Sequence, residues 1–546
     1  NDDQSRLVYR VHPLPETMMD YVWDFGSLEP QVERFYISSI VNSLLGAGKW
    51  RQHHELLVSL LSISQSFVRQ RETDWSVSLR DVRRCIGLVE WFGEHQVCVQ
   101  PKPKSGLVAE FVDWVAGRPN RVDVTPPLRA MILALAHCYH CRFADHDVRK
   151  EYRARIAHEM QQHHLNNFIE ENFAAVLDAE QRAYLSLMEL RPGTALNGAL
   201  LENVFVVLVC IINRIPVFLV GKPGCSKSLS LQLINANLRG PDSKSEYFRR
   251  LPSVYMVSYQ GSESSTSEGI SAVFQKAQKY REHNAADHSN VIPVVLLDEV
   301  GLAEASKYNP LKVLHSLLEP GYPKERPDVA VVGISNWSLD AAKMNRAIHL
   351  SRPEPDVEDL FETGRSIQQL PEHDFASAGL IRALATAYHD YYRTQSRPNF
   401  HGLRDYYSLV KCLTQRSGGW RQLEVSELVD ALARNFGGLP AQMNRIQEIF
   451  VNSVQSQAGL QDLSPPPVVE LIEANLRDVE ARHLMLITEG ESAINILGGL
   501  LRSREPIVIY GSHYPDDQTE HYSYRILSRI ILCMETGKVL DFFFFS

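Results

Sequence analysis

The chain has 546 residues, of which 44% are hydrophobic and 22% are charged, and it carries a formal net charge of -9 at pH 7. This length and apolar content are enough for two or three domains, each with a core of its own. The negative charge excludes a motor that tracks nucleic acid, because the sequence has no stripe of lysines and arginines interleaved with aromatic residues to neutralise phosphates.

The first 190 residues predict helices and contain two patterns that return later in the chain. Val77-Ser-Leu-Arg-Asp-Val82 returns as Gly402-Leu-Arg-Asp-Tyr406, and Arg10-Val-His-Pro-Leu-Pro-Glu16 returns loosely as His349-Leu-Ser-Arg-Pro-Glu-Pro355. The copies lie too far apart for a solenoid of short repeats. We therefore predict an array of tandem domains.

A cluster of histidines and cysteines follows. His137-Cys-Tyr-His-Cys141, with His146 nearby, has the C-x-x-C spacing and the imidazoles typical of a zinc site. A closed zinc site needs a second pair of ligands, and no such pair follows at a suitable distance. The cluster instead continues the apolar run from Met131 to Ala136, so we expect it to belong to a helical core.

The chain has eight cysteines and no secretory leader pattern, which favours reduced thiols and a cytosolic setting. Its longest apolar run, Val204 to Ile212, ends at Asn213 and Arg214 and is too short to cross a membrane. This run predicts a buried helix that leads into the first strand of a sheet.

A phosphate loop is the strongest signal in the sequence. The apolar strand Val217 to Val220 breaks into a loop that matches G-x-x-x-x-G-K-[ST], except that Ser226 stands where the second glycine is usual. Backbone N–H groups of such a loop, with the N-terminus of the following helix, can cradle a phosphate. We expect Lys227 to reach the β- and γ-phosphates and Ser228 to offer its hydroxyl to Mg²⁺. The predicted nucleotide-binding residues of this loop are Gly221, Lys222, Pro223, Gly224, Cys225, Ser226, Lys227 and Ser228.

Cys225 has two interpretations. It lies near a helix N-terminus and the Lys227 ammonium, which could lower the pKa of its thiol and make it oxidisable. We favour the other interpretation, in which a small side chain fills the loop. The two interpretations differ in the pKa that they require of the thiol.

A second apolar run, Val294 to Leu297, predicts a strand buried on both faces of a parallel sheet, and it ends in Asp298 and Glu299. Two adjacent carboxylates at a buried strand end are costly unless the site uses them. We expect Asp298 to hold Mg²⁺ through water, and Glu299 to orient and deprotonate the water that attacks phosphate. The two motifs together favour a nucleoside triphosphate site over a loop that binds nothing.

Three further residues complete the predicted site. Val329 to Asn336 predicts another buried strand, whose terminal Asn336 senses the γ-phosphate or is simply a satisfied strand-end asparagine. Arg346 precedes a strand-like segment, Ala347 to Ser351, and Arg404 lies in a helical pattern. Both arginines are candidates for contact with phosphate, and a surface ion pair is the alternative.

The order of these motifs resembles the AAA+ ATPases over about residues 200–450. The resemblance implies an α/β fold, in which a P-loop NTPase core with a parallel sheet flanked by helices is followed by an α-helical lid, in tandem modules. It implies ATP as the nucleotide, with Mg²⁺, bound between core and lid. Arg404 would contact the nucleotide from the lid, and Arg346 would serve the site of the preceding module.

Longer phrases resemble the mysterin family, giant intracellular proteins that combine a dynein-like AAA+ array with a RING-type ubiquitin ligase. The phrases include VSLRDVRRCIGLVEWF, VFLVGKPGCSKSLS, VVLLDEVGLAEASKYNPLKVLHSLLEPGYP and SNWSLDAAKMNRAIHLSRP. The resemblance spans nearly the whole chain and implies that the ubiquitin-transfer machinery lies outside it. It also implies a cytosolic location and an association with lipid droplets.

On this resemblance the chain covers parts of three consecutive modules. Arg80 would be the lid arginine of the first. The predicted segments are the helical C-terminal part of a preceding module at 1–190, a nucleotide-binding core at 191–353, its helical lid at 354–450, a linker at 451–484 and the truncated start of a degenerate module at 485–546.

The last of these segments gives weak signals. Pro506-Ile-Val-Ile-Tyr-Gly511 predicts a short strand, and Gly511-Ser-His-Tyr-Pro515 stands where a phosphate loop could be but lacks G-K-[ST]. We expect no nucleotide there. The apolar tail Asp541-Phe-Phe-Phe-Phe-Ser546 is typical of a truncation.

The favoured function is ATP binding and hydrolysis that drives or gates conformational change in a ring-like array. Its partners would be neighbouring AAA+ modules of the same chain and the ubiquitination machinery. Two alternatives stay open: a structural module that holds nucleotide without turnover, and a protein-binding scaffold. Glu299 argues against the first, because a nucleotide holder needs Lys227 and Asp298 but no base. The intact phosphate loop argues against the second.

Overall fold

The computed structural model describes the chain as two units. The first unit comprises Asn1–Ala385 and Gly402–Arg404, and the second comprises Thr386–His401 and Asp405–Ser546. The described residues are 14–23, 28–45, 48–72, 76–95, 124–191, 193–286, 290–319, 327–370, 374–416, 423–454, 466–478, 483–484, 486, 492–502, 505–510 and 520–543.

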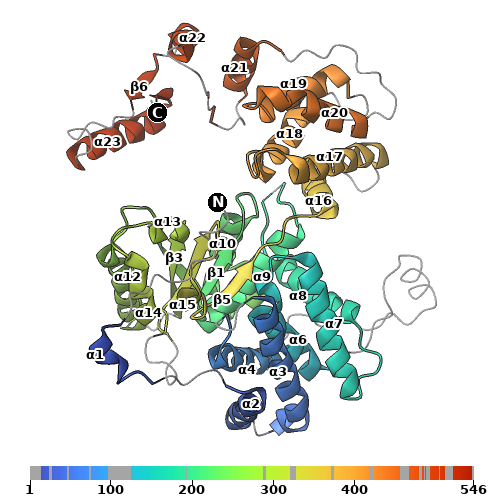
Figure 1. The fold of residues 1–546 in the computed structure, drawn as a ribbon. Helices are drawn as coiled ribbons and strands as arrows, with labels where there is room; N and C mark the ends of the chain where they lie inside the picture. The colour runs from blue at the N-terminus through green and yellow to red at the C-terminus, as the bar shows by residue number, and fades with distance from the viewer. Residues whose placement is uncertain are drawn as a thin grey trace. The chain divides into compact units, whose positions relative to one another are not determined.

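A five-stranded parallel sheet forms the centre of the first unit (Figure 1). The strand order is β2-β3-β4-β1-β5, so the chain crosses over repeatedly and helices cover both faces. The sequence predicted β1, β4 and the second half of β3 as apolar strands and β5 as a strand-like segment, and these predictions are confirmed. The strands are β1 (Val217–Val220), β2 (Ser253–Gln260), β3 (Val291–Asp298), β4 (Ala330–Ser335) and β5 (Ile348–Ser351).

Alternate residues of β1 pack into two different cores. Val217 and Leu219 of β1 face a core that they share with α9, α10 and the helices ahead of the sheet. Phe218 and Val220 face a second core with α12, α13 and α14. The helices that alternate with the strands are α9 (Gly198–Asn213), α10 (Lys227–Asn237), α11 (Glu246–Arg249), α12 (Ser267–Ala286), α13 (Val300–Glu304), α14 (Leu314–Leu317), α15 (Ala341–Met344) and α16 (Val357–Ile367).

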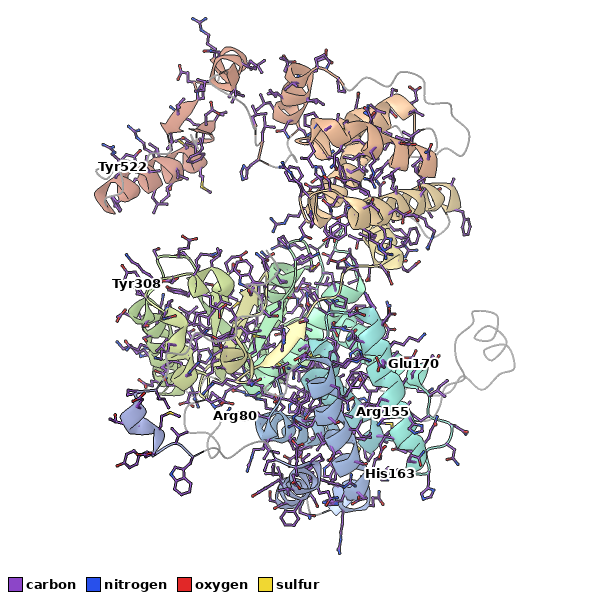
Figure 2. All side chains as sticks on the ribbon, in the orientation of Figure 1. Arg80, Arg155, His163, Glu170, Tyr308 and Tyr522 are labelled. Atoms are coloured by element: carbon purple, nitrogen blue, oxygen red, sulfur yellow. The ribbon has the colours of Figure 1, made fainter. Side chains whose placement is uncertain are left out.

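The helices ahead of the sheet form a bundle that continues the first core. Most of them bury one face: on α7, Tyr152 and Ile156 are buried while Arg155 is exposed (Figure 2). α4 begins at a capping box, in which the Ser78 N–H donates to Asp81 Oδ2 at 2.9 Å. The helices are α1 (Glu16–Met19), α2 (Pro30–Leu45), α3 (His54–Arg71), α4 (Leu79–Glu94), α6 (Pro126–Cys138), α7 (His146–Gln162) and α8 (Glu170–Ser186), and the 3-10 turns of the unit are η2 (Gly48–His53), η3 (His140–Arg142), η4 (Gly240–Asp242) and η5 (Pro310–Val313).

The second unit is helical and has an aromatic core. The rings of Tyr388 and Tyr406 stack at 4.9 Å, and Phe436 packs against Tyr391 at 5.8 Å and Phe450 at 5.4 Å. Its elements are α17 (Phe375–Thr394) and α18 (Leu403–Arg416), each of which also contributes residues to the first unit, then α19 (Val425–Asn435), η7 (Pro440–Gln442), α20 (Met443–Val454), α21 (Val468–Arg477), α22 (Ser492–Leu500), β6 (Ile507–Tyr510), α23 (Glu520–Thr536) and β7 (Leu540–Phe543).

Several expectations fall partly or wholly outside the described residues. These are most of the pattern Arg10–Glu16, the loop Gly511–Pro515 and residues 544–546 of the tail. The strand predicted around residue 508 is confirmed as β6, and the buried helix predicted ahead of the sheet is confirmed as part of α9. Within the described ranges, no helix combines the length and the apolar character that a membrane span requires. The division into five segments stays a prediction.

Candidate nucleotide site

The predicted site residues, apart from Arg346, gather at one edge of the sheet. Val220, the last residue of β1, lies opposite Ser335, the last residue of β4, in a parallel register. Strands that run parallel end on the same side, so the phosphate loop after β1, Asn336 after β4 and the carboxylates that end β3 emerge together. This is the side of an open α/β sheet at which ligands bind.

The phosphate loop contains two residues with left-handed backbone. Gly224 has a φ of 95° and Ser226 has a φ of 56°. Glycine adopts this conformation at little cost, whereas serine is strained by its Cβ. The loop is also closely enclosed, because a Cβ on Gly221 would lie 2.7 Å from Arg352 Cβ and one on Gly224 would lie 2.8 Å from Leu403 Cβ.

Of the remaining loop residues, Lys222, Pro223 and Ser228 are accessible, whereas Cys225 and Lys227 are buried. Lys222 forms an ion pair with Glu354, while Pro223 and Ser228 are exposed. Ser228 is the second residue of α10, so its hydroxyl is in the first turn of that helix. The first turn of a helix presents unsatisfied N–H groups and a partial positive charge, which favour phosphate.

Lys227 is folded over the loop. Its Nζ donates to the backbone oxygens of Gly221 and Lys222, the latter at 3.1 Å, and to Asn336 Oδ1 at 3.0 Å. Burial lowers the pKa of Lys227; the charge of Glu299 opposes this shift. An ammonium held by neutral oxygens in this way can exchange them for phosphate oxygens, which attract it more strongly.

Asn336 joins Lys227 to Glu299. Its Nδ2 donates to Glu299 Oε2 at 2.9 Å, while its Oδ1 accepts from Lys227. Glu299 has a φ of 49°, and its backbone N–H donates to Asp298 Oδ1 at 3.0 Å. A Cβ on Gly261 would lie 2.4 Å from the Glu299 carbonyl oxygen, so the end of β2 fixes the backbone of this residue. The structure thus brings the predicted lysine, base and sensor into one hydrogen-bonded chain.

Arg404 lies at the same edge. It belongs to the first unit, and its charge is among those that lower the pKa of Lys227. Its backbone N lies 3.6 Å from the position that a Cβ on Gly224 would take. The start of α18 therefore places Arg404 beside the phosphate loop, and its contact with nucleotide stays a prediction.

Arg346 lies at the opposite edge. It precedes β5, whose first residue Ile348 is paired with Val217, the first residue of β1. Its Nη1 donates to the Ala342 carbonyl at 2.6 Å. The four-residue strands place roughly 10 Å between the two edges. Arg346 is therefore not brought to the phosphate loop of this unit.

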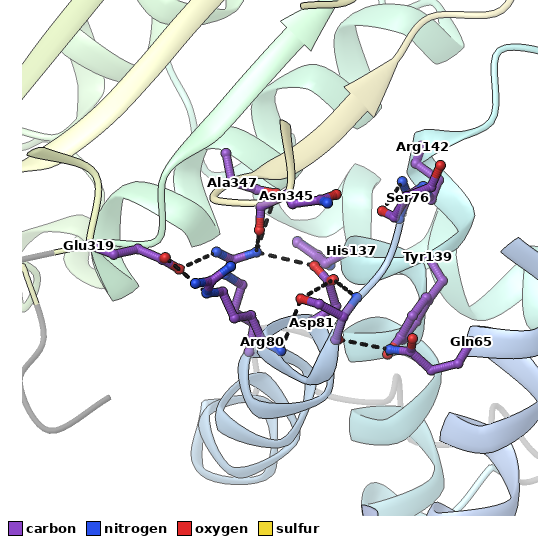
Figure 3. A network of polar contacts seen from close by, with 12 residues as sticks. Gln65, Ser76, Arg80, Asp81, His137, Tyr139, Arg142, Glu319, Asn345 and Ala347 are labelled. Carbon is purple, nitrogen blue, oxygen red and sulfur yellow. Dashed lines mark hydrogen bonds and ion pairs between the residues drawn. The ribbon is translucent and has the colours of Figure 1, made fainter. Parts of the chain in front are cut away.

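The turn that carries Arg346 is instead bound by α4. Arg84 Nη1 donates to the carbonyl oxygens of Asn345 at 3.1 Å and Ala347 at 3.4 Å, and its Nη2 donates to Glu319 at 2.6 Å. Arg80, the predicted lid arginine, pairs with the same Glu319 carboxylate at 3.2 Å (Figure 3). Arg80 and Arg84 thus lie around one carboxylate, and Arg84 also binds the carbonyls on both sides of Arg346.

Three residues that support the loop were not predicted. Asn203 of α9 donates from Nδ2 to the Cys225 carbonyl at 2.9 Å. Its neighbour Glu202 accepts from Arg149 and Arg352, and the Arg352 side chain packs on Gly221. The only sign of these contacts in the sequence is a pair of polar residues, Glu202 and Asn203, directly before the apolar run of the helix.

The cysteine interpretations are decided by burial. Cys225 is buried, and burial raises the pKa of its thiol, which contradicts the alternative of a lowered pKa and supports the packed filler. His137, His140 and Cys141 are buried, and the described residues contain no group of three or more His, Cys, Asp or Glu side chains that could hold a metal ion. These three residues belong to the core, but the helix expected to carry them, α6, ends at Cys138, and His140 and Cys141 lie in the 3-10 turn η3.

The donor set of the nucleotide site fits Mg²⁺. Asp298 supplies a carboxylate and Ser228 a hydroxyl, both hard oxygen ligands, at the edge where phosphate would bind. Mg²⁺ in such sites takes one or two protein oxygens and completes its octahedron with phosphate oxygens and water. A larger cage of protein ligands is not needed for this ion.

Family models described as RNF213 AAA domains match residues 193–359 and 473–542. The human E3 ubiquitin-protein ligase RNF213 is 35% identical over 563 residues, which cover 98% of this chain and 10% of that protein. The chain belongs to the RNF213, or mysterin, family. The zebrafish (Danio rerio) E3 ubiquitin-protein ligase rnf213-beta is also 35% identical over 98% of this chain.

The chain thus spans about 10% of the length of the curated RNF213 proteins that it matches. Among solved structures, the ORC2 protein of Aeropyrum pernix, described as ADPNP-ADP complexes, is 12% identical with a TM-score of 0.30, over 61% of this chain and 84% of that one. The α/β core with its phosphate loop and the two matched domains make this chain an AAA+ segment of the family.

Proposed function

We propose that the first unit binds MgATP and hydrolyses it. The observation that carries the proposal is the chain of hydrogen bonds from Lys227 through Asn336 to Glu299. A phosphate-binding lysine and a carboxylate base share one neutral amide, so a γ-phosphate that binds Lys227 also changes the surroundings of Glu299. ATP as the nucleotide is taken from the family.

In the reaction, water attacks the γ-phosphorus, the bond to the β,γ-bridging oxygen breaks, and ADP and phosphate leave. Glu299 accepts the proton of the water, and Asn336 orients Glu299 through its Nδ2 donor. Lys227, the loop N–H groups and Arg404 bind the phosphates. Mg²⁺, held by Ser228 and Asp298, would neutralise charge on the β- and γ-phosphates.

An arginine from outside this unit is expected to complete the site. Arg346 lies at the far edge of the sheet, and Arg404 is a binding residue at the loop. An arginine finger raises hydrolysis by about 10³ to 10⁵-fold. We therefore expect this chain to bind ATP and to turn it over slowly.

The test compares the wild-type chain with two variants. Calorimetric titration with MgATP measures binding, and a single-turnover assay measures hydrolysis of the bound nucleotide. K227A is expected to lose binding. E299Q is expected to bind as the wild type does but to cleave at least about 100-fold more slowly. Equal, very slow cleavage by wild type and E299Q, in a chain extended through complete flanking modules, would favour a module that only holds nucleotide.

The roles of this chain within a larger protein are proposed from the family resemblance. We propose that nucleotide turnover drives or gates conformational change in a larger AAA+ array, with neighbouring modules as partners. Ubiquitin transfer would be carried out by a part of the protein outside this chain. A cytosolic location and association with lipid droplets belong to the same proposal.

A further inference from the structure

The phosphate loop rests on a buried asparagine of the preceding helix. Asn203 lies in α9 with none of its surface exposed, and its Nδ2 donates to the Cys225 carbonyl at 2.9 Å. The amide orientation follows from this contact, because a carbonyl oxygen cannot accept from Oδ1. Among the described residues, Asn203 Oδ1 has no hydrogen-bond partner.

The cost of this arrangement indicates a role other than stability. A buried polar atom without a partner destabilises a fold, and an apolar side chain of similar size would pack against the neighbouring residues of α9 without that cost. The residues that follow it, Val204 to Ile211, are apolar or cysteine and buried. What Asn203 provides is therefore the one bond that it makes, to the loop.

That bond fixes the direction of the next peptide group. A peptide unit is planar and trans, so its carbonyl oxygen and its N–H point to opposite sides. When Asn203 holds the Cys225 carbonyl toward α9, the Ser226 N–H must point away from α9. Among the described residues this N–H has no hydrogen-bond partner, as expected of a donor kept for a ligand.

Ser226 is the residue that needs such help. It has a φ of 56° at the position where the phosphate-loop pattern has glycine. A glycine takes a left-handed conformation without strain, whereas a serine there tends to relax toward negative φ and turn the preceding peptide. A hydrogen bond to the carbonyl of that peptide opposes the rotation.

We propose that Asn203 is a positioning residue for nucleotide binding, which holds the Cys225–Ser226 peptide in its phosphate-binding orientation and compensates for the missing glycine at position 226. This proposal rests on the proposed nucleotide-binding function. It predicts that the affinity for nucleotide depends on Asn203 only when residue 226 is a serine and not a glycine.

The test is a double-mutant cycle with MgATP in the full chain, read by calorimetric titration. N203L is expected to weaken binding by about tenfold, the effect of losing one hydrogen bond. In the S226G background the same substitution is expected to cost less than about threefold, since glycine needs no support at this position. The unfolding temperature without nucleotide should be equal or higher in N203L, which separates positioning from stability.

The matched control is Asn213, the other buried asparagine of α9 with a described side-chain bond. Its Nδ2 donates to the Val209 carbonyl of its own helix at 2.9 Å, away from the loop. N213L is expected to leave the affinity for MgATP unchanged. If N203L does not fold, N203A provides the same comparison in both backgrounds.

Two results overturn the inference. One is an affinity of N203L equal to that of the wild type. The other is an equal loss in the Ser226 and S226G backgrounds, which would make Asn203 independent of the residue it is proposed to support. A wild-type chain that binds no MgATP would instead refute the proposed function itself.

Discussion

Replacing Glu202 by glutamine is expected to destabilise the first unit strongly. Arg149 Nη1 donates to both oxygens of this carboxylate at 3.0 Å, and Arg352 Nη1 donates to Oε2. All three side chains are less than a tenth exposed. Burial raises the pKa of Glu202, but the two guanidinium charges more than offset it, so the pKa falls from 4.5 to about 2.

The magnitude follows from this shift. Because the folded-state pKa lies below that of the unfolded chain, the ionised carboxylate contributes its full stability above about pH 4.5 and loses it as the pH falls toward 2. The difference corresponds to about 3 kcal/mol at about 1.36 kcal/mol per pKa unit. Glutamine also leaves two buried cations without an anion, for which a cost of about 3 to 5 kcal/mol is usual.

The assay is urea unfolding of wild type and E202Q, followed by tryptophan fluorescence at pH 7 and pH 3. We expect a gap in the free energy of unfolding of about 3 kcal/mol or more at pH 7, shrinking by about half at pH 3 as the wild-type carboxylate loses its advantage. E246Q is the control, because Glu246 and Arg250 form a pair that is more than 70% exposed on each side. Such a pair is worth less than about 1 kcal/mol. A gap of equal size at both pH values would refute the charge argument.

Three further changes test the packing and the chemistry of the first unit. G333A is expected to lower the unfolding temperature sharply, because the new Cβ would lie 2.1 Å from the Phe218 ring, and an unchanged temperature would contradict the close contact of β1 and β4. R84M is expected to lower the free energy of unfolding by about 2 kcal/mol or more, because Glu319 and the carbonyls that Arg84 binds lose a buried donor. The same change at the more exposed Arg80 is expected to cost less than about 1 kcal/mol. Equal losses in the two variants would contradict this distinction. Cys225, with its raised pKa, is expected to react with N-ethylmaleimide at pH 7 more slowly than a small free thiol, and a rate equal to that of the small thiol would restore the oxidisable interpretation.

The elements of the site could be predicted because burial on both faces leaves a plain pattern. β1 and β4 are buried at every position, so they appear in the sequence as uninterrupted apolar runs. The polar residue that follows each run is then visible as the end of a strand. β2 gave no such signal: it is an edge strand, only Val257 in it is buried, and it was missed.

The support beneath the loop could not be predicted for a different reason. Glu202 and Asn203 contact residues that lie far away in the sequence, and no local pattern specifies partners at such distances. In an otherwise apolar helix they suggest only that something polar faces them. The partners, Cys225 and Arg352, follow β1 and β5, which lie side by side and share a core with α9.

The assignment of Arg346 and Arg80 to a preceding module stays a prediction. An arginine finger must touch the γ-phosphate, and Arg346 is separated from the phosphate loop by the length of strands β1 and β5. Arg84 binds the carbonyls on both sides of Arg346, and Arg80 shares Glu319 with Arg84. A unit built in this way has its candidate nucleotide site at the carboxyl ends of its strands and carries Arg346 near the other ends. We infer that hydrolysis of nucleotide at Lys227 depends on an arginine of a following module. Loss of that module should therefore slow hydrolysis while the affinity for nucleotide is kept.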